Sequence, residues 1–79
     1  MNLCHTGLGD AVVRSLTQYF QDLDGQSPVP IYDMVIKCVE RPMLAFVLER
    51  ASGNQSVAAQ LLGINRNTLR RKLVDHDLL

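Results

Sequence analysis

The amino-acid sequence predicts an all-α protein whose subunit has four helices, the last two forming a helix-turn-helix. Two short segments, 55–62 and 66–73, have helical spacing of their apolar residues and are joined by a glycine. Segment 10–23 carries one apolar stripe, and segment 31–52 is apolar on nearly every side, with 14 of its 22 residues apolar. Seventy-nine residues make one small domain, near the size at which a single core becomes marginal.

The chain is expected to begin with a flexible arm, residues 1–9, which contains two glycines and no periodic apolar pattern. A helix should begin at Asp10, a residue type that caps helix N-termini. Within it, Val12, Leu16 and Phe20 recur four residues apart and lie on one face. The first helix is therefore amphipathic.

Asp24 and Gly25 should end this helix, and a loop at residues 26–30, which contains two prolines, should separate it from the next. The second helix, 31–52, loses its polar stripe after Pro42, and residues 43–48 are an unbroken apolar run. Pro42 should kink this helix because it removes one backbone donor. In so short a chain, a second copy is expected to cover the apolar run.

The first helix of the helix-turn-helix is expected at 55–62, with Asn54 as its N-cap. The small residues 58–59 lie where two helices must approach closely, and Leu61 and Leu62 are expected to pack. Gly63 suits the turn because glycine adopts a positive φ at little cost.

The second helix of this unit is expected at 66–73, with Asn65 as its N-cap. Leu69 and Leu73 are four residues apart, so they share a face that can pack against Leu62 and Ile64. The remaining face is polar and basic, as a helix that enters the major groove of DNA requires.

Net charge is zero, but it is unevenly distributed. Residues up to Ser52 include four basic and six acidic side chains, whereas those from Gly53 onward include four basic and two acidic ones. An ordinary helical hairpin with solvated charges is the alternative interpretation. It is disfavoured because Arg66 lies in the first turn of its helix, where positive charge opposes the helix dipole.

The sequence predicts no catalytic, metal or cofactor site. Cys4 and Cys38 are too few for a disulfide framework, and Cys38 is expected in the core. Cys4 and His5 lack the further ligands of a metal site, and His76 should be solvated. No leader or membrane-spanning run is recognisable, so a cytoplasmic protein is expected.

Three segments together resemble the Fis (factor for inversion stimulation) family of bacterial nucleoid proteins. They read LTQYFQDLDGQ at 16–26, IYDMVIKCVERPML at 31–44 and GNQSVAAQLLGINRNTLRRKL at 53–73. The resemblance implies an intertwined homodimer, with dimerisation helices at 10–52 and a DNA-binding helix-turn-helix at 53–79. It also implies two recognition helices closer together than one turn of B-DNA, and therefore a protein that bends DNA in the nucleoid and regulates transcription.

The resemblance also assigns roles to individual residues. Those implied to contact DNA bases or phosphates are Asn54, Ser56, Asn65, Arg66, Thr68, Arg70 and Arg71, and the basic face of the helix at 66–73 adds Lys72 as a further expected contact. On the two dimerisation helices, the residues expected to form the dimer interface are Leu16, Phe20, Val35, Val39, Met43, Phe46 and Val47.

The sequence departs from better-known family members at several positions. Val57, Val74 and Asp75 occupy positions that are basic in those members, and Asn67 replaces a glycine. The arm before Asp10 is too short for the β-hairpin through which longer members contact a DNA invertase, which argues against that activity.

The expected partners are double-stranded DNA, a second copy of the chain and, for a transcription regulator, RNA polymerase. Two alternatives remain at this point: a detached DNA-binding module of an enhancer-binding activator, and a helical adaptor that binds an acidic protein.

Overall fold

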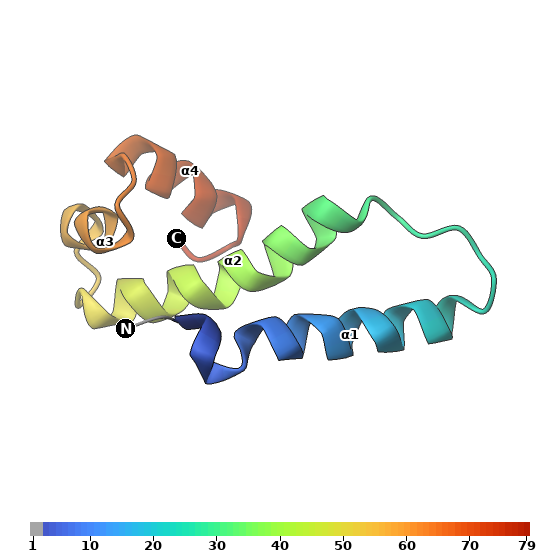
Figure 1. The fold of residues 1–79 in the computed structure, drawn as a ribbon. Helices are drawn as coiled ribbons and strands as arrows, with labels where there is room; N and C mark the ends of the chain where they lie inside the picture. The colour runs from blue at the N-terminus through green and yellow to red at the C-terminus, as the bar shows by residue number, and fades with distance from the viewer. Residues whose placement is uncertain (1–2) are drawn as a thin grey trace. The chain divides into compact units, whose positions relative to one another are not determined.

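The computed structural model describes residues 3–79 and contains one 3₁₀ helix and four α-helices in this range, with no strand (Figure 1). The elements are η1 (Leu3–Thr6), α1 (Leu8–Leu23), α2 (Ile31–Arg50), α3 (Gln55–Leu62) and α4 (Arg66–Asp75). The prediction of an all-α chain with four helices is therefore confirmed. The chain divides into two compact units that meet between Val35 and Ile36, within α2.

In the N-terminal unit, helical structure begins earlier than predicted. Residues Leu3–Thr6 of the expected arm form η1, and α1 begins at Leu8; Met1 and Asn2 lie outside the described residues. Gly7, with a φ of 89°, occupies the N-cap position. The prediction of Asp10 as the cap was wrong, because a glycine in the left-handed region already starts the helix.

Two residues with positive φ, Asp24 and Gly25, end α1 as predicted. The loop that follows is attached to α1 by one side chain, since the Val29 amide donates to the Tyr19 hydroxyl at 3.2 Å. Although α1 is amphipathic in sequence, it contributes no buried residue, and Phe20 is 51 % exposed.

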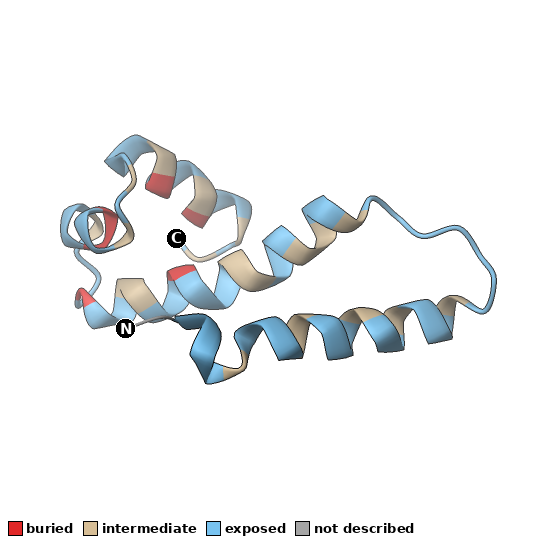
Figure 2. Cartoon of the chain, viewed as in Figure 1, coloured by how far each residue is buried: buried red, intermediate tan, exposed pale blue. Residues whose placement is uncertain are grey.

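The core lies in the C-terminal unit, where α2, α3 and α4 contribute all of the buried residues in the described chain except Ala51, which follows α2 (Figure 2). The buried residues are Leu44, Ala51, Ala58, Ala59, Leu69 and Leu73, and Val47, Leu48, Leu62, Ile64 and Leu78 pack against them. Leu61 is 60 % exposed, so its predicted packing role was wrong. Ala58, Ala59 and Leu62 define the inner face of α3, and Leu61 falls outside it.

The turns that connect these helices use left-handed residues. Gly63, with a φ of 73°, ends α3 as predicted, and the Ile64 amide donates to the Ala59 carbonyl at 3.1 Å. α2 ends at Arg50, and Ser52 takes the left-handed position there, with the Gly53 amide donating to the Leu48 carbonyl at 2.9 Å.

Pro42 lies inside α2, and the kink expected there remains a prediction. Cys38, on the same helix, is exposed in the single chain, so its assignment to the core was wrong. None of the helices within residues 3–79 combines the length and the apolar character that crossing a membrane requires.

Candidate nucleic-acid interface

The two helices of the C-terminal hairpin begin at asparagine caps, as the sequence predicted. The Asn54 side-chain oxygen accepts from the Val57 amide at 3.1 Å, and the Asn65 side-chain oxygen accepts from the Asn67 amide at 2.7 Å. Because each cap uses the amide oxygen, the amide nitrogen remains available as a donor. Both asparagines are exposed.

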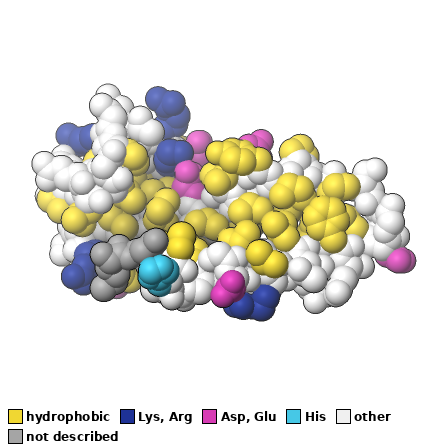
Figure 3. All heavy atoms as spheres, in the orientation of Figure 1, with side chains coloured by type: hydrophobic (Ala, Val, Ile, Leu, Met, Phe, Trp, Pro, Cys, Tyr) yellow, Lys and Arg dark blue, Asp and Glu magenta, His cyan; other side chains and the backbone are white. Residues whose placement is uncertain are grey.

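α4 divides into an apolar face and a basic face. Leu69 and Leu73 have no exposed surface and anchor α4 in the core. Arg66, Arg70 and Arg71 are exposed, and Figure 3 shows dark blue Lys and Arg side chains over the helix-turn-helix. The leucines thus fix the helix, and the arginines are free of the core.

The other predicted contact residues differ in exposure. Ser56, in the first turn of α3, is exposed, whereas Thr68, in the first turn of α4, is partly buried. Together with the exposed caps, these short polar side chains surround the N-termini of two helices, where backbone amides and the helix dipole favour anions.

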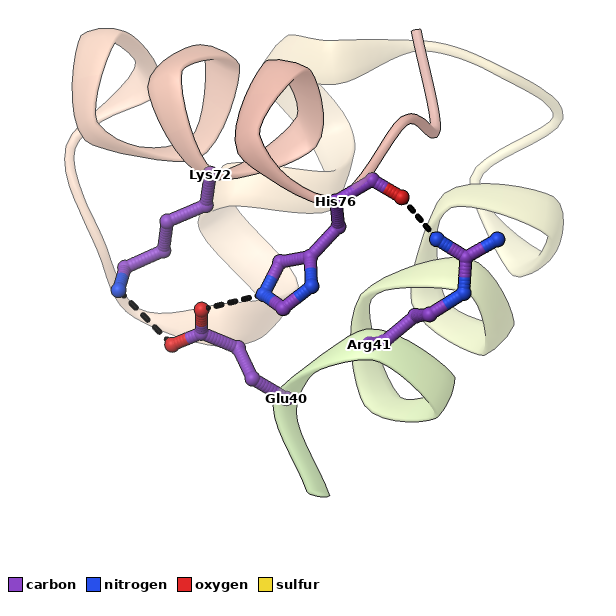
Figure 4. A network of polar contacts seen from close by, with 4 residues as sticks. All are labelled: Glu40, Arg41, Lys72 and His76. Carbon is purple, nitrogen blue, oxygen red and sulfur yellow. Dashed lines mark hydrogen bonds and ion pairs between the residues drawn. The ribbon is translucent and has the colours of Figure 1, made fainter. Parts of the chain in front are cut away.

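Lys72 lies in a different environment from the arginines of α4. Its Nζ atom is 2.8 Å from Oε2 of Glu40, a residue of α2 (Figure 4). The Lys72 side chain is 35 % exposed and that of Glu40 is 16 % exposed. The ammonium group predicted to contact DNA is therefore engaged in an ion pair within the chain.

His76 completes the same network, and its predicted solvation was wrong. Its side chain is 11 % exposed, and its Nε2 atom is 2.8 Å from Oε1 of Glu40. Since an ionised carboxylate can only accept, Nε2 must carry the hydrogen. The Arg41 guanidinium donates to the His76 backbone carbonyl, so two neighbouring residues of α2 hold the C-terminal end of α4 (Figure 4).

These contacts lower the pKa of Glu40. Hydrogen bonds from Lys72 and then from His76 hold the pKa of Glu40 below its ordinary value, and they outweigh the opposing effect of burial. Glu40 therefore stays ionised at neutral pH and brings a third acidic group to a segment that has four basic and two acidic residues in sequence.

The predicted dimer-interface residues range from partly buried to exposed in the single chain. Phe46 is 67 % exposed, Phe20 51 % and Met43 44 %. Leu16, Val35 and Val39 are partly buried. Val47 is also partly buried, and it packs against the core of the helix-turn-helix.

α3 and α4, two short helices that meet through alanines and leucines and are joined at a left-handed glycine, form a helix-turn-helix. Residues 36–75 match the family described as bacterial regulatory protein, Fis family. The chain belongs to the Fis family.

Curated relatives are similar in sequence to this chain over most of its length. A protein of Ralstonia nicotianae named as a Fis-like DNA-binding protein is 60 % identical over 65 residues, which cover 82 % of this chain and 84 % of the relative. Two proteins of the same name from Neisseria meningitidis, serogroups A and B, are each 50 % identical over 72 residues, covering 91 % of both chains.

Proposed function

We propose that this chain forms a homodimer that binds and bends DNA on the bacterial chromosome and thereby regulates transcription. The observation that carries the proposal is the division of α4 into a buried leucine face and an exposed arginine face, behind an asparagine cap. The names of the relatives, which describe DNA-binding proteins, support it.

In this proposal α4 is the helix that enters the major groove. Arg66 and Asn65, at its N-terminus, contact base edges, and Arg70 contacts the DNA one turn further along α4. An arginine can donate two hydrogen bonds to N7 and O6 of a guanine, which no other base accepts in the same way. Arg66 therefore contributes sequence preference as well as charge.

Phosphate contacts are assigned to residues around the helix N-termini. Asn54 and Ser56 lie at the start of α3, Thr68 lies in the first turn of α4, and Arg71 adds an exposed guanidinium. Backbone amides at these N-termini suit phosphate oxygens, and the short polar side chains can donate in the same direction.

The proposed dimer explains the uncovered apolar surface. Phe46 and Met43 are large apolar side chains that a monomer would leave in water, whereas a second copy of the chain can bury them. A dimer also presents two copies of α4 to one duplex. If these copies are closer than a helical turn, the duplex must bend to meet both.

Replacing Arg66 tests the base contact. Arg66→Ala should weaken binding by about 1–3 kcal/mol per half-site and flatten the preference for one base pair, because a bidentate contact is lost. Fluorescence anisotropy with duplexes that differ at single base pairs measures both effects. Arg14→Ala, which removes an exposed arginine from α1, is the matched control and should leave the preference unchanged.

An equal loss of affinity for every duplex would reduce Arg66 to a phosphate contact. Native protein that binds DNA without salt dependence, or fails to bind it, would contradict the proposed function and favour an acidic protein partner. The three exposed α4 arginines bring six positive charges per dimer to the duplex, and if each displaces about one counterion, the slope of log K against log salt should be about −5.

A further inference from the structure

We infer that Glu40 holds Lys72 away from DNA, so that Glu40 lowers the affinity of the reading helix for phosphate and limits its salt dependence. The inference rests on the proposed DNA-binding function and deepens it. It assigns an affinity-limiting role to a residue of α2 that itself does not contact DNA.

Both oxygens of the Glu40 carboxylate form hydrogen bonds. Lys72 Nζ is 2.8 Å from Oε2, and His76 Nε2 is 2.8 Å from Oε1. Glu40 therefore contacts both Lys72 of α4 and the C-cap residue His76. Loss of either contact would leave one carboxylate oxygen without its hydrogen-bond donor. Arg41 of α2 also donates to the His76 carbonyl, which adds a second contact from α2 at this end of α4 (Figure 4).

The energetic comparison favours the ion pair within the chain. The Glu40 side chain is only 16 % exposed, so an ammonium that left it would not be fully replaced by water. Loss of Lys72 would leave one oxygen of this partly buried carboxylate without its donor, a cost that a phosphate contact by a flexible lysine, screened at physiological salt, only partly offsets. Within residues 3–79, Arg66, Arg70 and Arg71 form no such ion pair that they would have to leave.

The charges of Glu40 and Lys72 also support this inference. Glu40 stays ionised at neutral pH because hydrogen bonds from Lys72 and His76 lower its pKa. Its negative charge offsets that of Lys72, so this end of α4 offers DNA little net charge. Releasing Lys72 should therefore add one phosphate contact per chain.

A cycle of four proteins tests the inference: native, Glu40→Gln, Lys72→Gln and the double variant. Affinity for one duplex is measured by anisotropy over a series of salt concentrations. Lys72→Gln alone should leave the slope of log K against log salt unchanged. Glu40→Gln should raise affinity and steepen the slope by about 0.9 per chain, and the double variant should return to the native slope. Arg71→Gln is the matched control and should make the slope shallower.

The inference is overturned if Lys72→Gln makes the slope shallower by about the 0.9 per chain that a lost phosphate contact predicts. It is also overturned if the gain in Glu40→Gln persists in the double variant, since Lys72 would then not be its source. Circular dichroism confirms folding of each variant; if Glu40→Gln does not fold, the slope of Lys72→Gln decides alone. Native protein without DNA binding would instead overturn the proposed function, and the inference with it.

Discussion

The carboxylate of Glu40 accepts hydrogen bonds from Lys72 of α4 and from His76, the C-cap of α4, and this makes the stability of the helix-turn-helix sensitive to acid. Its pKa is lower in the folded chain than the ordinary 4.5, chiefly because Lys72 donates to the ionised form. Such a group stabilises the folded state above its unfolded pKa. That stabilisation is lost as pH falls through the folded pKa.

Glu40→Gln should therefore lose less stability in acid than the native protein. Between about pH 5 and about pH 3 the two proteins share every other carboxylate, so the difference between them reports the Glu40 carboxylate. Thermal unfolding followed by circular dichroism gives the melting temperature at each pH. Equal falls in melting temperature for both proteins would show that the Glu40 pairs contribute nothing to stability.

Individual residues could be predicted from sequence where their partners are local. Asn54 and Asn65 were assigned as caps because the amides they bind lie three and two residues further along. Glu40 pairs with residues 32 and 36 positions away, so no spacing in the sequence connects them. The engagement of Lys72 and the burial of His76 therefore required the fold.

At the scale of elements, α4 depends on two leucines for its position. Leu69 and Leu73 are fully buried between α2 and α3 residues, and their spacing of four gave a correct prediction of the buried face. The helix bounds were predicted less well where a backbone turn decides them. Gly7 starts α1 and Ser52 follows α2 in left-handed conformations, and neither is signalled by apolar periodicity.

Leu69→Ala should destabilise the protein by about 2–5 kcal/mol, because it leaves a cavity in a close-packed core. Leu61→Ala removes the same atoms from a side chain that is 60 % exposed, and it should change stability by less than about 0.5 kcal/mol. Urea unfolding measures both. Similar losses would mean that Leu61 is buried in the native assembly, contrary to the exposure in the single chain.

At the scale of the whole molecule, the exposed apolar side chains are the main support for the proposed dimer. Segment 43–48 was predicted to need cover on all sides, and the fold supplies part of it, since Leu44, Val47 and Leu48 pack on the helix-turn-helix. Phe46 and Met43 remain exposed. The dimer itself remains a prediction, because its partner surface belongs to another copy.

Phe46→Glu should prevent association and unfold the chain, because folding and dimer formation share one apolar surface. Val47→Glu is a weaker test, since Val47 also packs on the core of its own chain. Leu61→Glu places the same charge on a side chain of similar exposure outside the proposed interface, and it should remain dimeric. Sedimentation velocity with circular dichroism distinguishes these states. A stable, folded native monomer at micromolar concentration is the result that rules the dimer out.

Two copies of α4 in one dimer should bind a single duplex and deform it between the half-sites. Flexible or A/T-rich centres make this deformation easier, although no side chain reads those base pairs. The decisive measurement compares the affinity of native protein for two duplexes with identical half-sites, one with an A/T-rich centre and one with a G/C-rich centre. We expect measurably weaker binding to the G/C-rich duplex at physiological salt. Equal affinity for the two duplexes would contradict binding by two linked helices that bend DNA.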